Sequence, residues 1–129
     1  MEKPVPHANG DSRPFWDGCN AGELRFQRCR ACMRAQFYPR ALCARCHATD
    51  LAWEVSAGKG EVHSATTIHR GPSAAFKGPP YVVTLVDMDE GFRMMANLLG
   101  AEAAEIGDRV RLVFEQRGDQ QIPQVERDA

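Results

Sequence analysis

The sequence of 129 residues contains no apolar run that approaches the length of a membrane span. It also has no strong charge of one sign, because 16 basic residues face 17 acidic ones and the formal net charge is −1. A chain so close to neutrality has no overall field that would recruit nucleic acid or a membrane surface. Internal repeats and low-complexity tracts are absent as well. The length permits one core, or a small core with a metal-stapled module.

An apolar targeting segment is missing from the first residues, which are polar and contain prolines (MEKPVPHANG). We therefore expect a loose tail over residues 1–11 and a cytoplasmic, reducing setting. In such a setting, cysteines are free or bound to metal more often than they are paired in disulfides.

Four of the five cysteines form two pairs, Cys29-x-x-Cys32 and Cys43-x-x-Cys46. Each pair can fold as a knuckle with both thiolates facing one ion, and two knuckles make a tetrahedral four-sulfur site. This geometry is the one that zinc prefers in structural sites. A closed site of this kind leaves no open position for substrate, so the pattern predicts a structural zinc and no catalysis at the metal.

Other interpretations of these cysteines remain. Residues 43–47 (CARCH) match the C-x-x-C-H haem-attachment pattern, but that chemistry normally needs export and leaves Cys29 and Cys32 unexplained. Iron in a rubredoxin-like four-sulfur site stays open, because geometry alone does not exclude it. Knuckles often place a glycine at positive φ after the second cysteine, where this chain has Met33 and His47.

A short helix is predicted over residues 12–23, with Ser12 as its N-cap and Gly22 at its end. The aromatic pair Phe15-Trp16 and the fifth cysteine, Cys19, fall at helical spacing. We expect Cys19 to be a small apolar side chain on one face of the helix. The aromatic pair is either a core-facing stripe or a contact with a partner protein.

The charge is unevenly spread along the chain. Residues 25–45 contain six arginines and no acidic residue, whereas the chain from Asp50 onward has 13 acidic and 8 basic residues. The arginines either screen four thiolates around a dication, a site with a net charge of −2, or form a phosphate-binding surface, since arginine forks match phosphate oxygens.

Residues 24–57 predict a small zinc ribbon, and residues 58–129 predict five short antiparallel strands. Alternating or β-rich patterns place these strands at 62–68, 81–86, 92–98, 110–114 and 122–125, with one or two helical turns at 101–106. In the first strand, Val62, Ser64, Thr66 and Ile68 are expected on one face. The pattern is typical of an OB-fold barrel, so the predicted fold is mainly β: a helix, a ribbon and a barrel.

Read in this order, the chain resembles a small acyl-CoA-associated family of zinc-ribbon plus OB-fold proteins, long classed as a domain of unknown function. The resemblance covers about residues 12 to 126. It is carried by Leu24–Cys32 (LRFQRCRAC), Phe37–Cys46 (FYPRALCARC), Asp50–Val55 (DLAWEV), Gly58–Val62 (GKGEV), Thr67–Arg70 (TIHR), Pro80–Asp87 (PYVVTLVD) and Gly107–Glu115 (GDRVRLVFE).

The resemblance implies a non-catalytic companion subunit of thiolase-like enzymes, hydratases or aldolases that act on acyl-CoA. In such proteins the OB part contacts the catalytic partner and helps to hold CoA. CoA carries phosphates that suit cationic side chains and an adenine that stacks on aromatic rings. The long loop between the first two barrel strands supplies such residues, namely His69, Arg70, Phe76, Lys77 and Tyr81.

Independent catalysis is not expected. Cys19 has no base beside it in the sequence, His63 lies within a strand, and His69, the best acid–base candidate, has no recognisable partner. Single-stranded nucleic-acid binding is the alternative function, because OB barrels and zinc ribbons serve it elsewhere. This barrel region is net acidic and offers few aromatic residues besides Tyr81 and Phe92, which disfavours that alternative.

Overall fold

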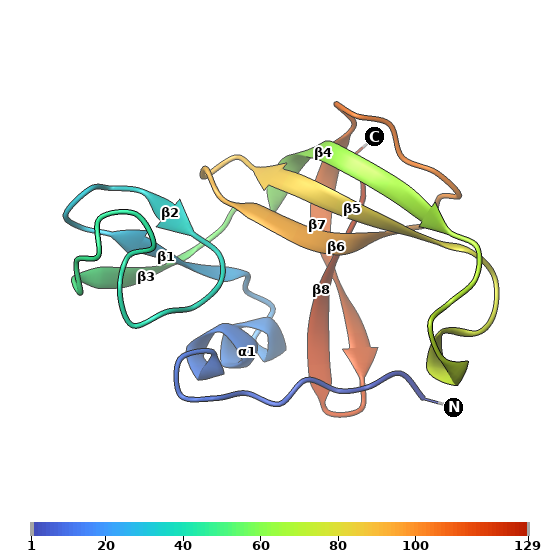
Figure 1. Ribbon diagram of the computed structural model, residues 1–129, viewed down its shortest axis with the longest axis horizontal. Coiled ribbons are helices and arrows are strands. Elements are labelled where there is room, and N and C mark those ends of the chain that lie inside the picture. Colours follow the sequence, from blue (N-terminus) through green and yellow to red (C-terminus); the bar gives the residue numbers. More distant parts are fainter. Residues whose placement is uncertain (1, 129) are drawn as a thin grey trace.

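Two small β-sheets and one helix make up the computed structural model, which describes residues 2–128 (Figure 1). The chain begins with helix α1 (Arg13–Asn20) and a three-stranded ribbon sheet of β1 (Arg25–Cys29), β2 (Ala35–Gln36) and β3 (Leu51–Val55). The barrel follows, with β4 (Lys59–Ile68), a short 3-10 turn η1 (Ala74–Phe76), β5 (Tyr81–Met88), β6 (Arg93–Leu99), β7 (Arg109–Arg117) and β8 (Gln120–Arg127). The predicted mainly β fold with a ribbon and a five-stranded barrel is confirmed. Within residues 2–128, no helix has the length and apolar character needed to cross a membrane.

The two ends of helix α1 are stabilised by different hydrogen-bond arrangements. Ser12 does not cap it through its side chain, contrary to the prediction, because its Oγ instead accepts a hydrogen bond from the Asn9 N–H (3.0 Å). Asn9 takes over the role, since its Oδ1 accepts from the Ser12 N–H at 2.8 Å. At the other end Gly22 adopts a φ of +80°, and the Gly22 and Glu23 N–H groups bond back to the carbonyls of Cys19 and Gly18. This Schellman arrangement explains why the helix stops where the glycine predicts.

The barrel strands are ordered β4-β5-β6-β8-β7, and β7 pairs with β4 to close the sheet. This is the strand order of an OB-fold barrel. One pair departs from the antiparallel prediction: β6 and β8 run parallel, with Leu98 opposite Val125. The predicted helical turns at 101–106 are also wrong. The Ala103 carbonyl there accepts from the Arg127 guanidinium (2.9 Å), and a segment this short has little tendency to nucleate a helix alone.

A β-bulge in β4 overturns the predicted face of that strand. Val62 lies opposite Val86, but the register then shifts, so that Ser64 lies opposite Leu85 and His63 is the extra residue. Directly opposed residues share a face of the sheet. The bulge therefore moves Ser64, Thr66 and Ile68 to the face opposite to that of Val62. Bulges leave weak signals in sequence, because the alternation of inward and outward residues continues after the extra residue with the two faces exchanged.

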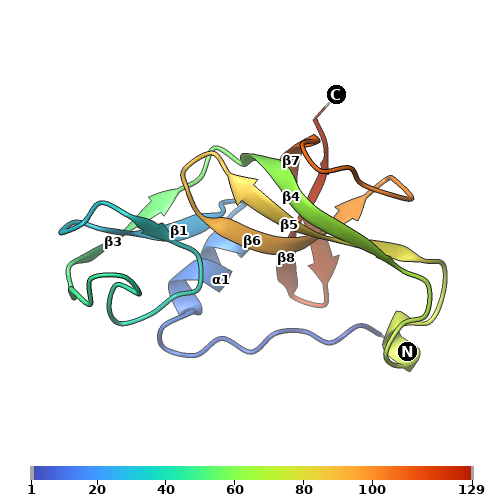
Figure 2. The ribbon, with the colours of Figure 1, turned by 45° about the horizontal axis from the view of Figure 1, so that its top comes forward.

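The ribbon and the barrel share one hydrophobic core. Phe26 of β1 stacks on Phe92 of the barrel (4.7 Å between ring centroids), and Phe37 of the ribbon stacks on the same ring at 5.5 Å. Phe15 of α1 meets Phe37 edge-on at 5.3 Å. Helix α1 lies beneath the junction of the two sheets and is bonded to β8, where the Gln121 N–H donates to Asn20 Oδ1 at 2.9 Å (Figure 2). These contacts join the three elements into one packed unit.

Candidate functional site

The four paired cysteines converge at the end of the ribbon. Their Sγ atoms all lie within 4.8 Å of one another, with Cys29 and Cys46 at 3.5 Å and Cys32 and Cys43 at 3.7 Å. Zinc–sulfur bonds of about 2.3 Å in a tetrahedron place sulfur atoms about 3.8 Å apart, so these residues fit a structural zinc site. The separations are far longer than a disulfide bond, which is about 2 Å. All four cysteines share one cluster, whereas the haem hypothesis uses only Cys43 and Cys46.

Both knuckles turn at the positions identified from the sequence. Met33 and His47 have φ values of 66° and 65°, and their N–H groups donate to the carbonyls of Cys29 (2.8 Å) and Cys43 (3.0 Å). Backbone amides also point at the sulfur atoms. The N–H groups of Cys46 (3.5 Å) and Arg45 (3.3 Å) lower the pKa of the Cys43 thiol to about 6. The backbone thus favours the thiolate form of Cys43, which is the form that binds metal, whereas the neighbouring cysteine side chains raise the pKa of Cys46 to about 11.

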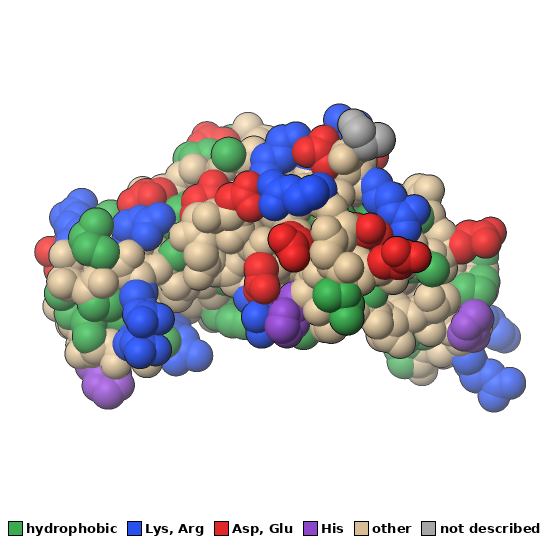
Figure 3. Space-filling view, turned by 90° about the horizontal axis from the view of Figure 1, so that it is seen from above, with side chains coloured by type: hydrophobic (Ala, Val, Ile, Leu, Met, Phe, Trp, Pro, Cys, Tyr) green, Lys and Arg blue, Asp and Glu red, His purple; other side chains and the backbone are tan. Residues whose placement is uncertain are grey.

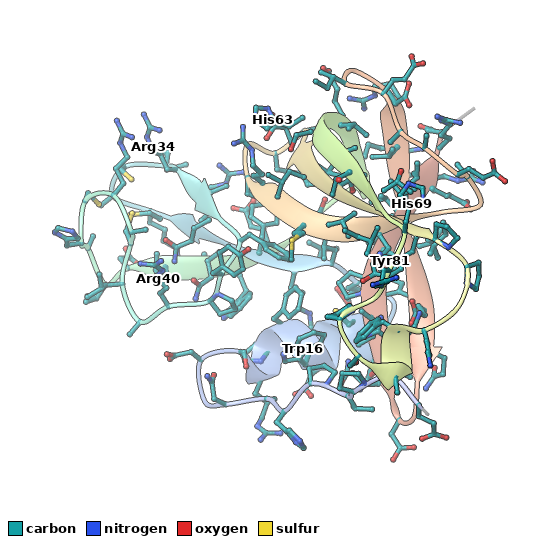
Figure 4. The ribbon with its side chains drawn as sticks, turned by 45° about the vertical axis from the view of Figure 1, so that its right-hand side comes forward. Trp16, Arg34, Arg40, His63, His69 and Tyr81 are labelled. Atoms are coloured by element: carbon teal, nitrogen blue, oxygen red, sulfur yellow. The ribbon has the colours of Figure 1, made fainter. Side chains whose placement is uncertain are left out.

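The ribbon arginines divide into two groups. Some are paired: Arg28 binds the Glu54 carboxylate at 3.0 Å and also donates to the Met33 carbonyl at 2.9 Å, which ties the first knuckle to β3. By contrast, residues 2–128 show no ion pair for Arg34, Arg40 or Arg45, of which Figure 4 labels the first two. Over the barrel, acidic and basic side chains lie intermixed on the face seen in Figure 3.

The predicted ligand loop is only partly assembled. His69, Arg70 and Lys77 line one shallow hollow within the loop. Phe76 and Tyr81 do not line it; their rings lie 6.1 Å apart beside it, and Tyr81 faces a different cavity. Gly71 keeps the loop tight, because a Cβ at that position would collide with the carbonyl oxygen of Phe76. The structure therefore brings three of the five predicted residues together.

Tyr81 faces a groove of about 450 Å³ that sequence reasoning missed. We call it the aromatic groove. It lies between α1, the ribbon and the outer face of β5, β6 and β8, and its main apolar lining residues are Trp16, Phe37, Tyr38, Tyr81, Val83, Met95 and Ile122. Trp16 lies below Tyr81 in the view of Figure 4.

The aromatic pair in α1 gave the one available signal for this groove. Phe15 is buried in the core, and Trp16 is half-buried, packs against the core and lines the groove, so the core-facing interpretation holds for Phe15 and in part for Trp16. A contact of Trp16 with a partner protein stays a prediction. The groove itself was hidden because its walls come from segments far apart in the chain. Two of its side chains are strongly exposed, Tyr38 at 62% and Met95 at 60%.

The residues considered for catalysis lie apart. Cys19 is fully buried in α1, as an apolar side chain would be, and this burial raises its pKa to about 12. His63 projects from the bulge on the barrel surface, where its Nδ1 lies 3.5 Å from Asp87 and 3.3 Å from Arg93. The guanidinium of Arg93 bonds Asp87 at 2.6 Å and holds the pKa of that carboxyl below its usual value.

Comparison with known proteins places this architecture in a defined class. Residues 16–52 match the rubredoxin-like zinc ribbon domain of ChsH2, and residues 53–115 match the C-terminal OB-fold domain of ChsH2. A chain of the Ltp2-ChsH2(DUF35) aldolase structure superposes with a TM-score of 0.85 and 31% identity, over 97% of this chain and 100% of that one. The protein is therefore of the zinc-ribbon plus OB-fold class.

Two curated relatives show which family within this class the chain belongs to. A DUF35 domain-containing scaffold protein of Methanothermobacter thermautotrophicus is 34% identical over 95 residues, which cover 70% of this chain and 71% of that protein. A probable enoyl-CoA hydratase alpha subunit of Thermomonospora curvata is 36% identical over 107 residues, covering 81% of this chain but 33% of the subunit. This chain thus spans about a third of the length of that subunit. It belongs to the ChsH2/DUF35 family, which confirms the resemblance found in the sequence.

Proposed function

We propose that this protein is a non-catalytic accessory subunit of an enzyme that acts on acyl-CoA thioesters. One observation carries the proposal: a chain of the Ltp2-ChsH2(DUF35) aldolase matches it along nearly its whole length. The side chains are consistent with this role. Four cysteine sulfur atoms face one another at the candidate zinc site, and the Cys19 thiol is buried with a raised pKa. Cysteines without disulfides also accord with a reducing, cytoplasmic setting.

The partner in this proposal is a hydratase or an aldolase, the two classes named among the relatives. A thiolase-like condensing enzyme is the further class that the sequence resemblance implies. The zinc, bound by Cys29, Cys32, Cys43 and Cys46, has a structural role in this proposal, because it holds the ribbon in its fold. The ribbon in turn packs on the barrel through Phe26 and Phe92.

The loop between β4 and β5 is proposed to hold the phosphates of CoA. His69, Arg70 and Lys77 surround one hollow, which gives an anion several donors at once. Phe76 and Tyr81 add aromatic surface beside it for the adenine. Gly71 allows the loop backbone to pass close to Phe76, which brings the two ends of the loop together.

Affinity purification of the tagged protein from its own cells tests the accessory role. We expect a stoichiometric acyl-CoA enzyme among the captured proteins, and no turnover of acyl-CoA by the isolated chain. Robust turnover by the isolated chain would refute the role. For the loop, the double change Arg70→Glu and Lys77→Glu should weaken CoA binding. Matched reversal of Arg93 and Arg111, which lie on exposed strand surfaces, should not. Equal loss in both double variants would refute the loop assignment.

A further inference from the structure

The aromatic groove has a volume that suits an extended apolar group. Its cavity is about 450 Å³, and at roughly 30 Å³ for each water-sized unit it holds about fifteen such units. An acetyl group would leave most of this space empty, whereas an acyl chain of about ten carbons, each close to a water in size, would occupy about two thirds of it.

The amide and charged side chains that line the groove are already bonded to the protein. Asn97 Nδ2 donates to the Val82 carbonyl at 3.1 Å, and Gln124 accepts from the Asn97 N–H at 2.6 Å. The cation at the edge, Arg117, pairs with Glu115 at 2.6 Å. No unpaired charge is left for a carboxylate or a phosphate. The groove therefore suits the apolar part of a ligand and not its anionic part.

The charged part has a place next to the groove. Tyr81 lines the groove at the start of β5, and its ring lies 6.1 Å from that of Phe76, which belongs to the loop that carries Arg70 and Lys77. In Figure 4, His69 of this loop lies above Tyr81, while Trp16 of the groove lies below it. An apolar groove beside a cationic loop suits a ligand with a polyanionic head and a long apolar tail, and in an acyl-CoA the pantetheine arm would span the distance between them.

The groove is also preformed. Phe37 in its wall is stacked on Phe92 of the core and touches Phe15 of α1 edge-on. Fixed walls reduce the entropy that a ligand loses when it orders its site, so burial of an acyl chain translates more fully into affinity.

We infer that the aromatic groove receives the acyl chain of the thioester whose CoA phosphates lie at the His69–Lys77 loop, and that it favours long apolar acyl groups over short ones. The inference rests on the proposed binding of acyl-CoA by this subunit. It adds the class of acyl group and names Trp16, Tyr38 and Met95 as the side chains that select it.

Titration calorimetry on the full chain tests the inference with four probes: CoA, acetyl-CoA, decanoyl-CoA and free decanoate, all below their micellar concentrations. Because each buried methylene contributes about 0.8 kcal/mol, or about fourfold in affinity, partial burial of the chain should make decanoyl-CoA at least tenfold tighter than acetyl-CoA. Met95→Glu should abolish this difference and leave CoA binding unchanged. The matched control is Ile106→Glu, at a side chain that is 78% exposed and lies outside the groove; it should behave as the unmodified protein.

Each other outcome overturns the inference in a distinct way. Equal affinities for acetyl-CoA and decanoyl-CoA would leave the loop proposal standing and remove the groove from it. Free decanoate that binds as tightly as decanoyl-CoA would show that the groove holds an apolar ligand without the CoA head. No binding of any thioester, combined with capture of an acyl-CoA enzyme, would refute the ligand site while the accessory role survives.

Discussion

The ring of Phe92 packs between the ribbon and the barrel, so its removal should weaken the coupling between the unfolding of the two parts. Phe92 is 4% exposed and stacks on both Phe26 and Phe37. Replacing a buried phenylalanine with alanine costs about 3–5 kcal/mol, and each stacked pair contributes about 0.5–1.5 kcal/mol beyond burial. The loss in Phe92→Ala should lie near the upper end of this range. It is a large part of the 5–15 kcal/mol that typically holds a domain together.

Unfolding in guanidinium can be followed with two probes, one for the barrel and one for the ribbon. Far-UV circular dichroism follows mainly the barrel strands, and a chromogenic chelator follows zinc release from the ribbon. In the unmodified protein both midpoints should coincide, because one core serves both parts. In Phe92→Ala, zinc release should begin at a lower denaturant concentration than the loss of strand signal.

Val86→Ala is the matched control, since Val86 is a fully buried barrel residue that forms no part of the aromatic stack. It should lower stability by about 2 kcal/mol through lost methyl groups, with both midpoints moving together. Coincident midpoints in Phe92→Ala, or a loss no larger than that of Val86→Ala, would refute the claim that this ring couples ribbon and barrel.

Three further predictions concern the metal, pH and nucleic acid. Elemental analysis should find one zinc per chain. The Cys43→Ser variant should lose the zinc and be less soluble, because metal binding and folding are coupled. A native protein that is fully folded without metal would contradict this prediction. The Arg109 guanidinium, bonded to both Asp89 oxygens at 2.8 and 3.0 Å, holds the pKa of Asp89 below its usual value. This pair should therefore stabilise the fold above about pH 4 and cease to do so as the pH falls further, so Asp89→Asn should lower the melting temperature at pH 7 but not at pH 2. Single-stranded oligonucleotides should bind weakly and lose affinity with salt; sub-micromolar binding at near-physiological salt would favour the nucleic-acid function.

The metal cluster could be predicted because the spacing of the cysteines itself encodes the geometry. Two residues between Cys29 and Cys32 suffice to fold a knuckle, whichever sheet surrounds it. The positions of Met33 and His47 could be predicted for the same reason, since a knuckle needs positive φ at a fixed place. Local rules of this kind do not depend on the rest of the chain.

The features that were missed depend on distant contacts. The extra residue His63 changes the face of β4 only because β5 fixes the register on both sides of it. Residues 101–106 form an irregular segment whose Ala103 carbonyl is bonded by Arg127, more than twenty residues away. The aromatic groove needs α1, the ribbon and the barrel in place before it exists. None of these partners could be assigned from the pattern of a single segment.

The electrostatics of the groove favour the proposed function over nucleic-acid binding, the alternative that an OB barrel suggests. Strands β5 and β6 correspond to the face on which OB barrels bind oligonucleotides, where aromatic platforms alternate with free cations along a basic groove. Here that face has the aromatic side chains, but the cation among its lining residues, Arg117, is neutralised by Glu115. A nucleic-acid backbone would bring one phosphate per nucleotide to a surface with no counter-charge. CoA carries its phosphates at one end, and the loop proposed to bind them, with Arg70 and Lys77, is linked to the groove through the contact of Phe76 with Tyr81. The distribution of charge therefore fits a ligand whose anionic groups are gathered at one end better than a strand with a phosphate on every unit.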